Sequence, residues 1–155
     1  MDKESVIQIW KDYQKDIHDV PNDYDVWSFG DSKDMANELA KLVLEGKKTA
    51  TSSNYILYEL EKEPLPYVGL HNIILDGDGK AVAIIETTAV EVLPFDKVTE
   101  EHAYLEGEGD GSLKYWRDVH EDFFKREFLE VEQEFNYQIP VVCERFKLVY
   151  KGLNY

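Results

Sequence analysis

Two short apolar runs, separated by a turn-rich segment, restrict the fold of this chain more than any other feature. Ile73-Ile74-Leu75 and Ala81-Val82-Ala83-Ile84-Ile85 flank Asp76-Gly77-Asp78-Gly79-Lys80. Because β-branched residues favour strands and Asp and Gly favour tight turns, this region predicts two antiparallel strands. The turn matches a calcium loop only in part, since Lys80 and Ala81 stand where such a loop needs Asp or Asn and then Gly.

Apolar stripes at three- and four-residue spacing predict three helices. Their members are Val6, Trp10, Tyr13 and Ile17 in the first, Met35, Leu39, Leu42 and Val43 in the second, and Leu113, Trp116, Val119 and Phe123 in the third. Ser32 and Ser112 are suited to cap the second and third helices, and Gly46 to end the second. With a closing strand over 141–150, the order of elements predicts an α+β domain with a small, mostly antiparallel sheet.

Length and charge limit the classes of function. The chain has 155 residues, the usual size of one domain, and 17 basic against 32 acidic side chains give a net charge of −15. Nucleic-acid affinity depends on lysines and arginines that displace counterions, so we expect no long duplex as a partner. No apolar run is long enough to cross a bilayer, and the N-terminus does not resemble a secretion signal. We therefore expect a cytoplasmic protein with no membrane partner, in which the single cysteine, Cys143, is buried.

Two further motifs do not support chemistry. Gly30-Asp31-Ser32 resembles the start of a GDS-type esterase, but the Asp-x-x-His that such an enzyme needs is missing, so Asp31 and Ser32 are better explained as helix caps. The four histidines, His18, His71, His102 and His120, have neither an i,i+4 pair nor cysteine partners. We therefore expect no metal site and no cofactor.

The segment Gly46-Lys47-Lys48-Thr49-Ala50-Thr51 contains a Gly-x-Lys-x-x-Thr string. By itself this string is weak, because a helix C-cap followed by solvated lysines has the same pattern. A second stretch makes it specific. Phe95-Asp96-Lys97-Val98-Thr99-Glu100-Glu101-His102-Ala103 is followed by Glu106-Gly107-Glu108-Gly109-Asp110 and by the helix that begins near Ser112.

In order and spacing, the two stretches together resemble the ASCH family, which is similar to PUA RNA-binding domains. The match runs from about Trp27 to Tyr150. The resemblance implies a small PUA-like β-barrel with flanking helices and a cleft on one side. We accordingly expect a single domain over 1–155, with an N-terminal helical extension over 1–26 and the barrel core over 27–150.

Some compact ASCH relatives look like amidohydrolases that remove an acetyl group from the exocyclic nitrogen of a cytidine, and others have been assigned RNA binding or RNA cleavage. In the amidohydrolases the working residues are the Lys and Thr of the string and a Glu after the His-Ala pair. The matching positions here are Lys48, Thr51 and Glu106. This chain is longer at its N-terminus than the compact enzymes, which leaves the transfer of their substrate open.

The three residue types suit amide hydrolysis. The Thr51 hydroxyl is inert unless a base lies beside it, Lys48 could be that base if its surroundings release its proton, and Glu106 could orient Lys48 or carry the proton. Lys48 and Thr51 converge only if the backbone turns between them, because side chains three residues apart in a strand point to opposite faces. The alternatives are that Lys48 binds a phosphate or carbonyl, that Thr51 is an ordinary strand residue, and that Glu106 belongs to a solvated acidic face.

Position gives further candidates for substrate binding. Trp27 and Tyr115 are aromatic and could stack on a base, Ser52 and Ser53 adjoin the string, and Arg117 is one of few cations near the acidic segment. Related sequences of this length often carry a basic residue where this chain has Gly111, so a phosphate contact is missing and phosphodiester chemistry is disfavoured.

Two functions follow from these patterns. The first is a hydrolase of acylated nucleosides, of the N4-acetylcytidine type, which the strong acidic charge favours. The second is a non-catalytic RNA-binding or regulatory module, or a ribonuclease. The expected ligand is a nucleoside, a nucleotide or a short RNA. The sequence leaves the oligomeric state open.

Overall fold

The computed structural model describes residues 1–152, and the last three residues of the predicted domain 1–155 lie outside the described residues. The helices are α1 (Lys3–Asp16), α2 (Lys33–Leu44), α3 (Tyr55–Glu61), α4 (Glu100–Glu106) and α5 (Leu113–Glu130), with a short 3₁₀ helix, η1 (Phe95–Lys97). The strands are β1 (Asp25–Trp27), β2 (Ala50–Asn54), β3 (His71–Leu75), β4 (Ala81–Pro94) and β5 (Pro140–Lys151).

The strands form one mixed sheet in the order β1-β3-β4-β5-β2. β1 pairs with β3 in parallel, and the other three pairs are antiparallel. The two long strands, β4 and β5, shift register between Ile84 and Ile85 and again between Thr87 and Ala89. Such irregularities bend and twist a sheet, and this one forms a half-barrel with β1 and β2 as its edges. The predicted class, α+β with a mostly antiparallel sheet and flanking helices, is confirmed.

The predicted hairpin is β3 and β4. In the turn, Asp76 Oδ1 accepts hydrogen bonds from the backbone N–H groups of Asp78 and Lys80. The carboxylate is thus occupied in holding the turn, as Asx turns require. Ser32 likewise caps α2 by accepting a hydrogen bond from the Met35 N–H, which confirms its predicted role.

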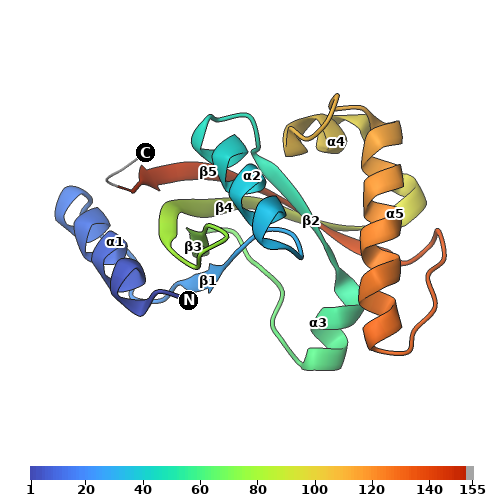
Figure 1. Cartoon of the computed structure of the whole chain (residues 1–155), viewed down its shortest axis with the longest axis horizontal. Coiled ribbons are helices and arrows are strands. Elements are labelled where there is room, and N and C mark those ends of the chain that lie inside the picture. Colours follow the sequence, from blue (N-terminus) through green and yellow to red (C-terminus); the bar gives the residue numbers. More distant parts are fainter. Residues whose placement is uncertain (153–155) are drawn as a thin grey trace.

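Helices cover the sheet at three places. α1 and α5 lie toward opposite ends of the molecule, and α2 crosses the sheet between them (Figure 1). α1 packs Val6, Ile9, Trp10 and Tyr13 against β3 and β4. It therefore belongs to the hydrophobic core, although it lies within the segment expected as an extension. Ile17, the last member of the predicted stripe, follows the end of α1 and is exposed.

The inward face of α5 differs from the predicted one. Its buried residues are Trp116, His120, Phe124 and Phe128, spaced by four. The expected Leu113, Val119 and Phe123 are half-buried at the margin of this face. The buried face is rotated relative to the predicted one, because it includes His120, a polar residue that a search for apolar spacing omits. This rotation matters because it directs an imidazole into the interior beside α4.

Each described helix is too short or too polar to span a bilayer.

Candidate functional site

Lys48 lies in the short connection between α2 and β2. Gly46 takes a left-handed conformation at φ 77°, and the N–H groups of Lys47 and Lys48 both donate to the Leu42 carbonyl oxygen. This C-terminal motif ends the helix and turns the chain sharply inward. As a result, the Lys48 side chain is only 1% exposed, with its Nζ 5.3 Å from the centre of the Phe29 ring.

Glu106 is the last residue of α4, a helix that Thr99 caps by accepting a hydrogen bond from the His102 N–H. Gly107 ends it at φ 70° and lies against the Lys47 carbonyl, which brings both Glu106 and Glu108 to Lys48. Lys48 Nζ is 3.3 Å from Glu106 Oε1 and 2.8 Å from Glu108 Oε2. The lysine and Glu106 thus form an ion pair between segments almost sixty residues apart, away from water.

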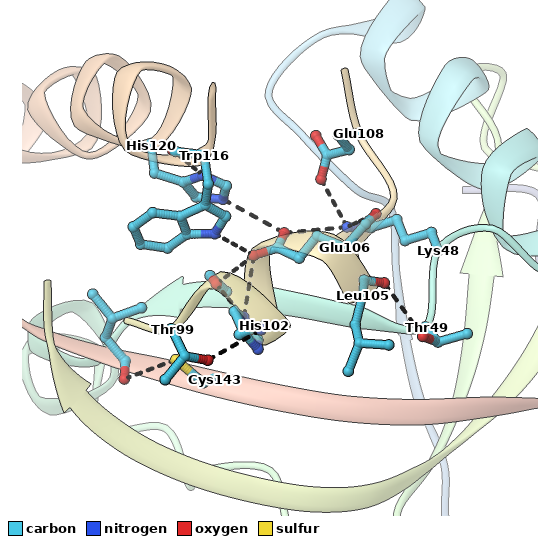
Figure 2. A network of polar contacts seen from close by, with 12 residues as sticks. Lys48, Thr49, Thr99, His102, Leu105, Glu106, Glu108, Trp116, His120 and Cys143 are labelled. Atoms are coloured by element: carbon cyan, nitrogen blue, oxygen red, sulfur yellow. Dashed lines mark hydrogen bonds and ion pairs between the residues drawn. The ribbon is translucent and has the colours of Figure 1, made fainter. Parts of the chain in front are cut away.

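A network of donors surrounds the Glu106 carboxylate (Figure 2). Ser52 Oγ donates to Oε2 at 2.6 Å, and the Trp116 indole N–H donates to the same oxygen. His102 Nε2 lies 2.8 Å from Ser52 Oγ and 3.2 Å from Glu106 Oε2. His120 Nε2 lies 3.6 Å from Oε1, with its ring stacked on that of Trp116. Both oxygens are therefore engaged from several directions, as a buried carboxylate requires.

The surroundings of Glu106 and His120 shift both titrations toward the charged forms. Burial alone would raise the pKa of Glu106, but the Lys48 ammonium and His120 outweigh it, and hydrogen bonds from His102 and His120 add to their effect. The pKa of Glu106 consequently lies well below its usual value. Burial lowers the pKa of His120, but the Glu106 carboxylate and the Trp116 carbonyl outweigh burial and raise it. Glu106 therefore stays ionised at neutral pH.

Thr51 shares a small cavity with this network. The cavity measures about 50 Å³, and its wall includes Lys48, Thr51, Ser52, Glu106 and His120. β2 begins at Ala50, so Lys48 precedes the strand and the alternation of strand side chains does not apply to it. The structure thus brings Lys48, Thr51 and Glu106 to the lining of one cavity, although the turn in this segment lies at Glu45–Gly46, before Lys48, and not between Lys48 and Thr51 as predicted.

Two of the predicted binding residues, Trp27 and Ser53, lie in a larger space inside the half-barrel. This space, here named the half-barrel hollow, measures about 280 Å³ and is lined by Asp25, Trp27, Thr51, Ser53, Tyr58, Glu63, Pro64, Pro66, Leu70, Asn72 and Glu144. Thr51 is common to the hollow and the small cavity. Thr51 therefore borders both spaces, and its neighbour on β2, Ser52, directs its hydroxyl to Glu106.

Tyr115 and Arg117 are not brought into either space. Both lie on the exposed side of α5, because the stripe through Trp116 and His120 is the one that faces inward. The Arg117 guanidinium reaches the Asp96 carbonyl oxygen at 3.5 Å, and the ring of Tyr115 lies beside Gly109. Their expected contact with a ligand in the cleft has no support from this geometry.

Sequence reasoning missed four members of the network: His102, Glu108, Trp116 and His120. One signal was available. His102 and Glu106 are four residues apart after Thr99, a good N-cap, so a short helix there would place both on one face. The acidic residues around Glu106 instead suggested a solvated face.

The family assignment follows from comparison with known proteins. A family model described as the ASCH domain matches residues 25–150. The chain belongs to the ASCH domain family. ASCH domains are structurally related to PUA-like RNA-binding folds. No curated protein is similar enough to the chain to match it.

Two solved structures are similar over nearly the whole ASCH chain. A protein from Enterococcus faecalis V583 has 39% identity and a TM-score of 0.86, covering 94% of this chain and 88% of that one. An ASCH domain from Lactobacillus crispatus JV V101 has 34% identity and a TM-score of 0.88, covering 95% of each chain. A third similar structure, of a hypothetical protein, has 18% identity and a TM-score of 0.52 over 79% of this chain and 96% of that one, and shows the fold alone.

Proposed function

We propose that this ASCH domain is a hydrolase that removes an acyl group from the exocyclic nitrogen of a nucleoside. The observation that carries the proposal is the shared cavity: Lys48, Thr51 and Glu106 are all among its lining residues, with Lys48 Nζ 3.3 Å from Glu106 Oε1. A hydroxyl, an amine and a carboxylate are the groups that a threonine-dependent amide hydrolysis needs.

In the proposed reaction, the Thr51 oxygen attacks the amide carbon while its proton passes to the Lys48 amine. The carbon–nitrogen bond then breaks, and Lys48 returns the proton to the leaving nitrogen. Water hydrolyses the resulting ester, which releases the carboxylic acid and restores the Thr51 hydroxyl. The same lysine thus acts first as base and then as acid.

Glu106 has a positioning and electrostatic role in this scheme. Its pKa is well below the usual value because Lys48 and His120 oppose the effect of burial, so it is a poor proton acceptor. Its carboxylate instead fixes the lysine and stabilises the ammonium that forms when Thr51 is deprotonated. Glu108, 2.8 Å from Lys48 Nζ and closer to solvent, is the second carboxylate that holds the lysine in place.

The volumes of the two spaces suit a substrate whose acyl group and nucleoside lie in separate spaces. A cavity of about 50 Å³ has room for a small acyl group but not for a nucleoside. The half-barrel hollow, about 280 Å³, is large enough for much of a nucleoside, and Thr51 lines both spaces. A substrate lying in the hollow would thus present its acyl group to the threonine hydroxyl.

An RNA-binding role is the second candidate, because the ASCH fold is related to PUA-like RNA-binding folds. Charge weighs against it. The net charge is −15, and the lysine of the site, Lys48, is buried between two carboxylates. A track of cations along which a phosphate backbone could lie is what RNA affinity requires.

The test is turnover of N4-acetylcytidine by wild-type protein and by two matched threonine variants. Thr51→Val removes the proposed nucleophile while keeping its shape, and we expect a loss of at least about 1,000-fold in turnover. Thr49→Val removes a hydroxyl that donates to the Leu105 carbonyl outside the cavity, and should cost about 1 kcal/mol of stability without loss of turnover. Absence of cytidine and acetate with folded wild-type protein would refute the proposal for this substrate.

A further inference from the structure

A row of polar side chains crosses the floor of the half-barrel hollow from one strand to the next. The Trp27 indole N–H on β1 donates to Asn72 Oδ1 on β3 at 2.9 Å. The Asn72 amide donates to Thr87 Oγ1 on β4 at 3.3 Å, and the Thr87 hydroxyl donates to Glu144 Oε2 on β5 at 2.6 Å. Four neighbouring strands thus contribute one hydrogen-bonded chain beneath a single cavity.

The members of this row are deeply buried. Asn72 is 2%, Thr87 0% and Glu144 5% exposed, although the neighbouring positions on these strands are filled by apolar residues such as Ile73 and Ile85. Polar groups at such positions reduce stability compared with apolar ones of the same shape, unless every hydrogen-bonding group is satisfied. The hydrogen bonds within the row satisfy this condition for Asn72 and Thr87, and they place the Glu144 carboxylate, at the end of the row, in the lining of the hollow.

The direction of the hydrogen bonds decides what kind of ligand fits. Each donor in the row is directed at the next residue, so the chain ends on a carboxylate that can only accept. Among residues 1–152, no lysine, arginine or histidine pairs with Glu144, in contrast to Glu106 with its ammonium and imidazoles. Burial first, and then the nearby charge of Asp25, raises the pKa of Glu144. Its charge is thus uncompensated within the described part of the chain.

The other residues that line the half-barrel hollow are also acidic or aromatic. Asp25 and Glu63 add two carboxylates, Trp27 and Tyr58 add two aromatic rings, and none of the basic residues within 1–152 lines the hollow. Carboxylates accept hydrogen bonds from hydroxyl and amino groups, and aromatic faces stack on planar rings. The same carboxylates repel phosphate, by about 1 kcal/mol per charge pair at 4 Å in water and more where solvent is excluded.

We propose that the half-barrel hollow binds the leaving half of the substrate and selects a nucleoside without phosphate, held by hydrogen bonds from its hydroxyl or amino groups to Glu144 and Asp25. As a statement about substrate, this inference rests on the proposed hydrolase function. It excludes nucleotides and RNA from this hollow, which the sequence left open as ligands.

The test is calorimetric binding of cytidine and of cytidine 5′-monophosphate at low ionic strength. Neither ligand carries an acyl group, so binding is measured without turnover. We expect cytidine to bind at least about tenfold more tightly than its monophosphate, with the ratio falling as salt is added. Asp25→Asn and Glu144→Gln should narrow the ratio. Because Asp25 is exposed, Asp25→Asn folds even if the substitution at the buried Glu144 does not.

Asp118→Asn is the matched control, since it removes the same charge from an exposed position on α5 that pairs with Lys114. It should leave the ratio unchanged. The inference is overturned if the monophosphate binds as tightly as cytidine, if cytidine does not bind, or if Asp118→Asn changes the ratio as much as Asp25→Asn does. Hydrolysis of N4-acetylcytidine without this selectivity would contradict the binding inference but not the proposed hydrolase function. Selective binding of cytidine without hydrolysis would contradict the hydrolase function but not the selectivity of the hollow.

Discussion

At the scale of single residues, the site depends on a lysine that is almost fully enclosed. Lys48 Nζ contacts Glu106 and Glu108, and its side chain is 1% exposed. Removing one member of a buried ion pair leaves the other charge without compensation, which is far more costly than losing a surface contact. The stability lost on replacing Lys48, compared with that lost on replacing its exposed neighbour Lys47, therefore measures what the buried network contributes to folding.

Lys48→Met should lower the free energy of unfolding by about 3–5 kcal/mol, because Glu106 keeps its burial but loses its ammonium partner. Lys47→Met, one residue earlier and exposed, should change it by no more than about 0.5 kcal/mol. Denaturant unfolding of the two variants checks this. Equal stabilities would mean that the buried pair contributes nothing to folding.

His120 predicts the pH dependence of stability. Its pKa is raised above the ordinary value of 6.5, since Glu106 and the Trp116 carbonyl outweigh the effect of burial. A raised pKa in the folded state gives stability that is fully present below about pH 6.5 and is lost as the pH rises through the folded-state pKa.

Unfolding measured between pH 6 and 9 should thus show a decline for the wild type that is reduced in His120→Gln. His18→Gln, at an exposed position, should decline as the wild type does. Parallel curves for all three proteins would show that His120 does not titrate in this range.

At the scale of elements, α4 is the piece that completes the site. It has seven residues, yet it supplies both His102 and Glu106, and Gly107 seats its end against the chain that carries Lys48. A Cβ at Gly107 would lie 2.1 Å from the Lys47 carbonyl oxygen, whereas one at Gly46 would meet nothing within 4 Å. Both glycines have positive φ, at 70° and 77°.

Gly107→Ala and Gly46→Ala therefore separate packing from backbone strain. Each should lose about 1 kcal/mol for the left-handed conformation, and Gly107→Ala should lose a further 2 kcal/mol or so because α4 must shift away from Lys47. Only Gly107→Ala should also reduce hydrolysis. Thermal unfolding and turnover, measured side by side, check both statements, and equal losses in the two variants would contradict the proposed seating of α4.

Elements with long apolar stripes could be predicted from the sequence, and short ones could not. α1, α2, α5 and the β3–β4 hairpin follow from periodicity. β1 has three residues and α3 has seven with none buried, so neither carries a readable pattern. α4 was hidden by its acidic composition. The inward turn of His120 depends on a tertiary contact with Glu106 that no local pattern contains.

At the scale of the whole molecule, the half-barrel places two spaces on either side of Thr51. One is small and holds the ion pair, and the other is larger, acidic and aromatic. The residues of the first, Lys48, Thr51 and Glu106, were accessible from the family resemblance. The second was reached only through Trp27 and Ser53, because Asn72, Thr87 and Glu144 look like ordinary strand residues until the sheet brings them into one row.

The most direct test is mass spectrometry of the protein quenched during turnover of N4-acetylcytidine. A covalent intermediate on Thr51 predicts a mass increase of one acetyl group, located in the peptide that contains residues 49–54, and absent in Thr51→Val. Turnover that persists in Thr51→Val, with no acetylated peptide in the wild type at any quench time, would contradict the threonine mechanism.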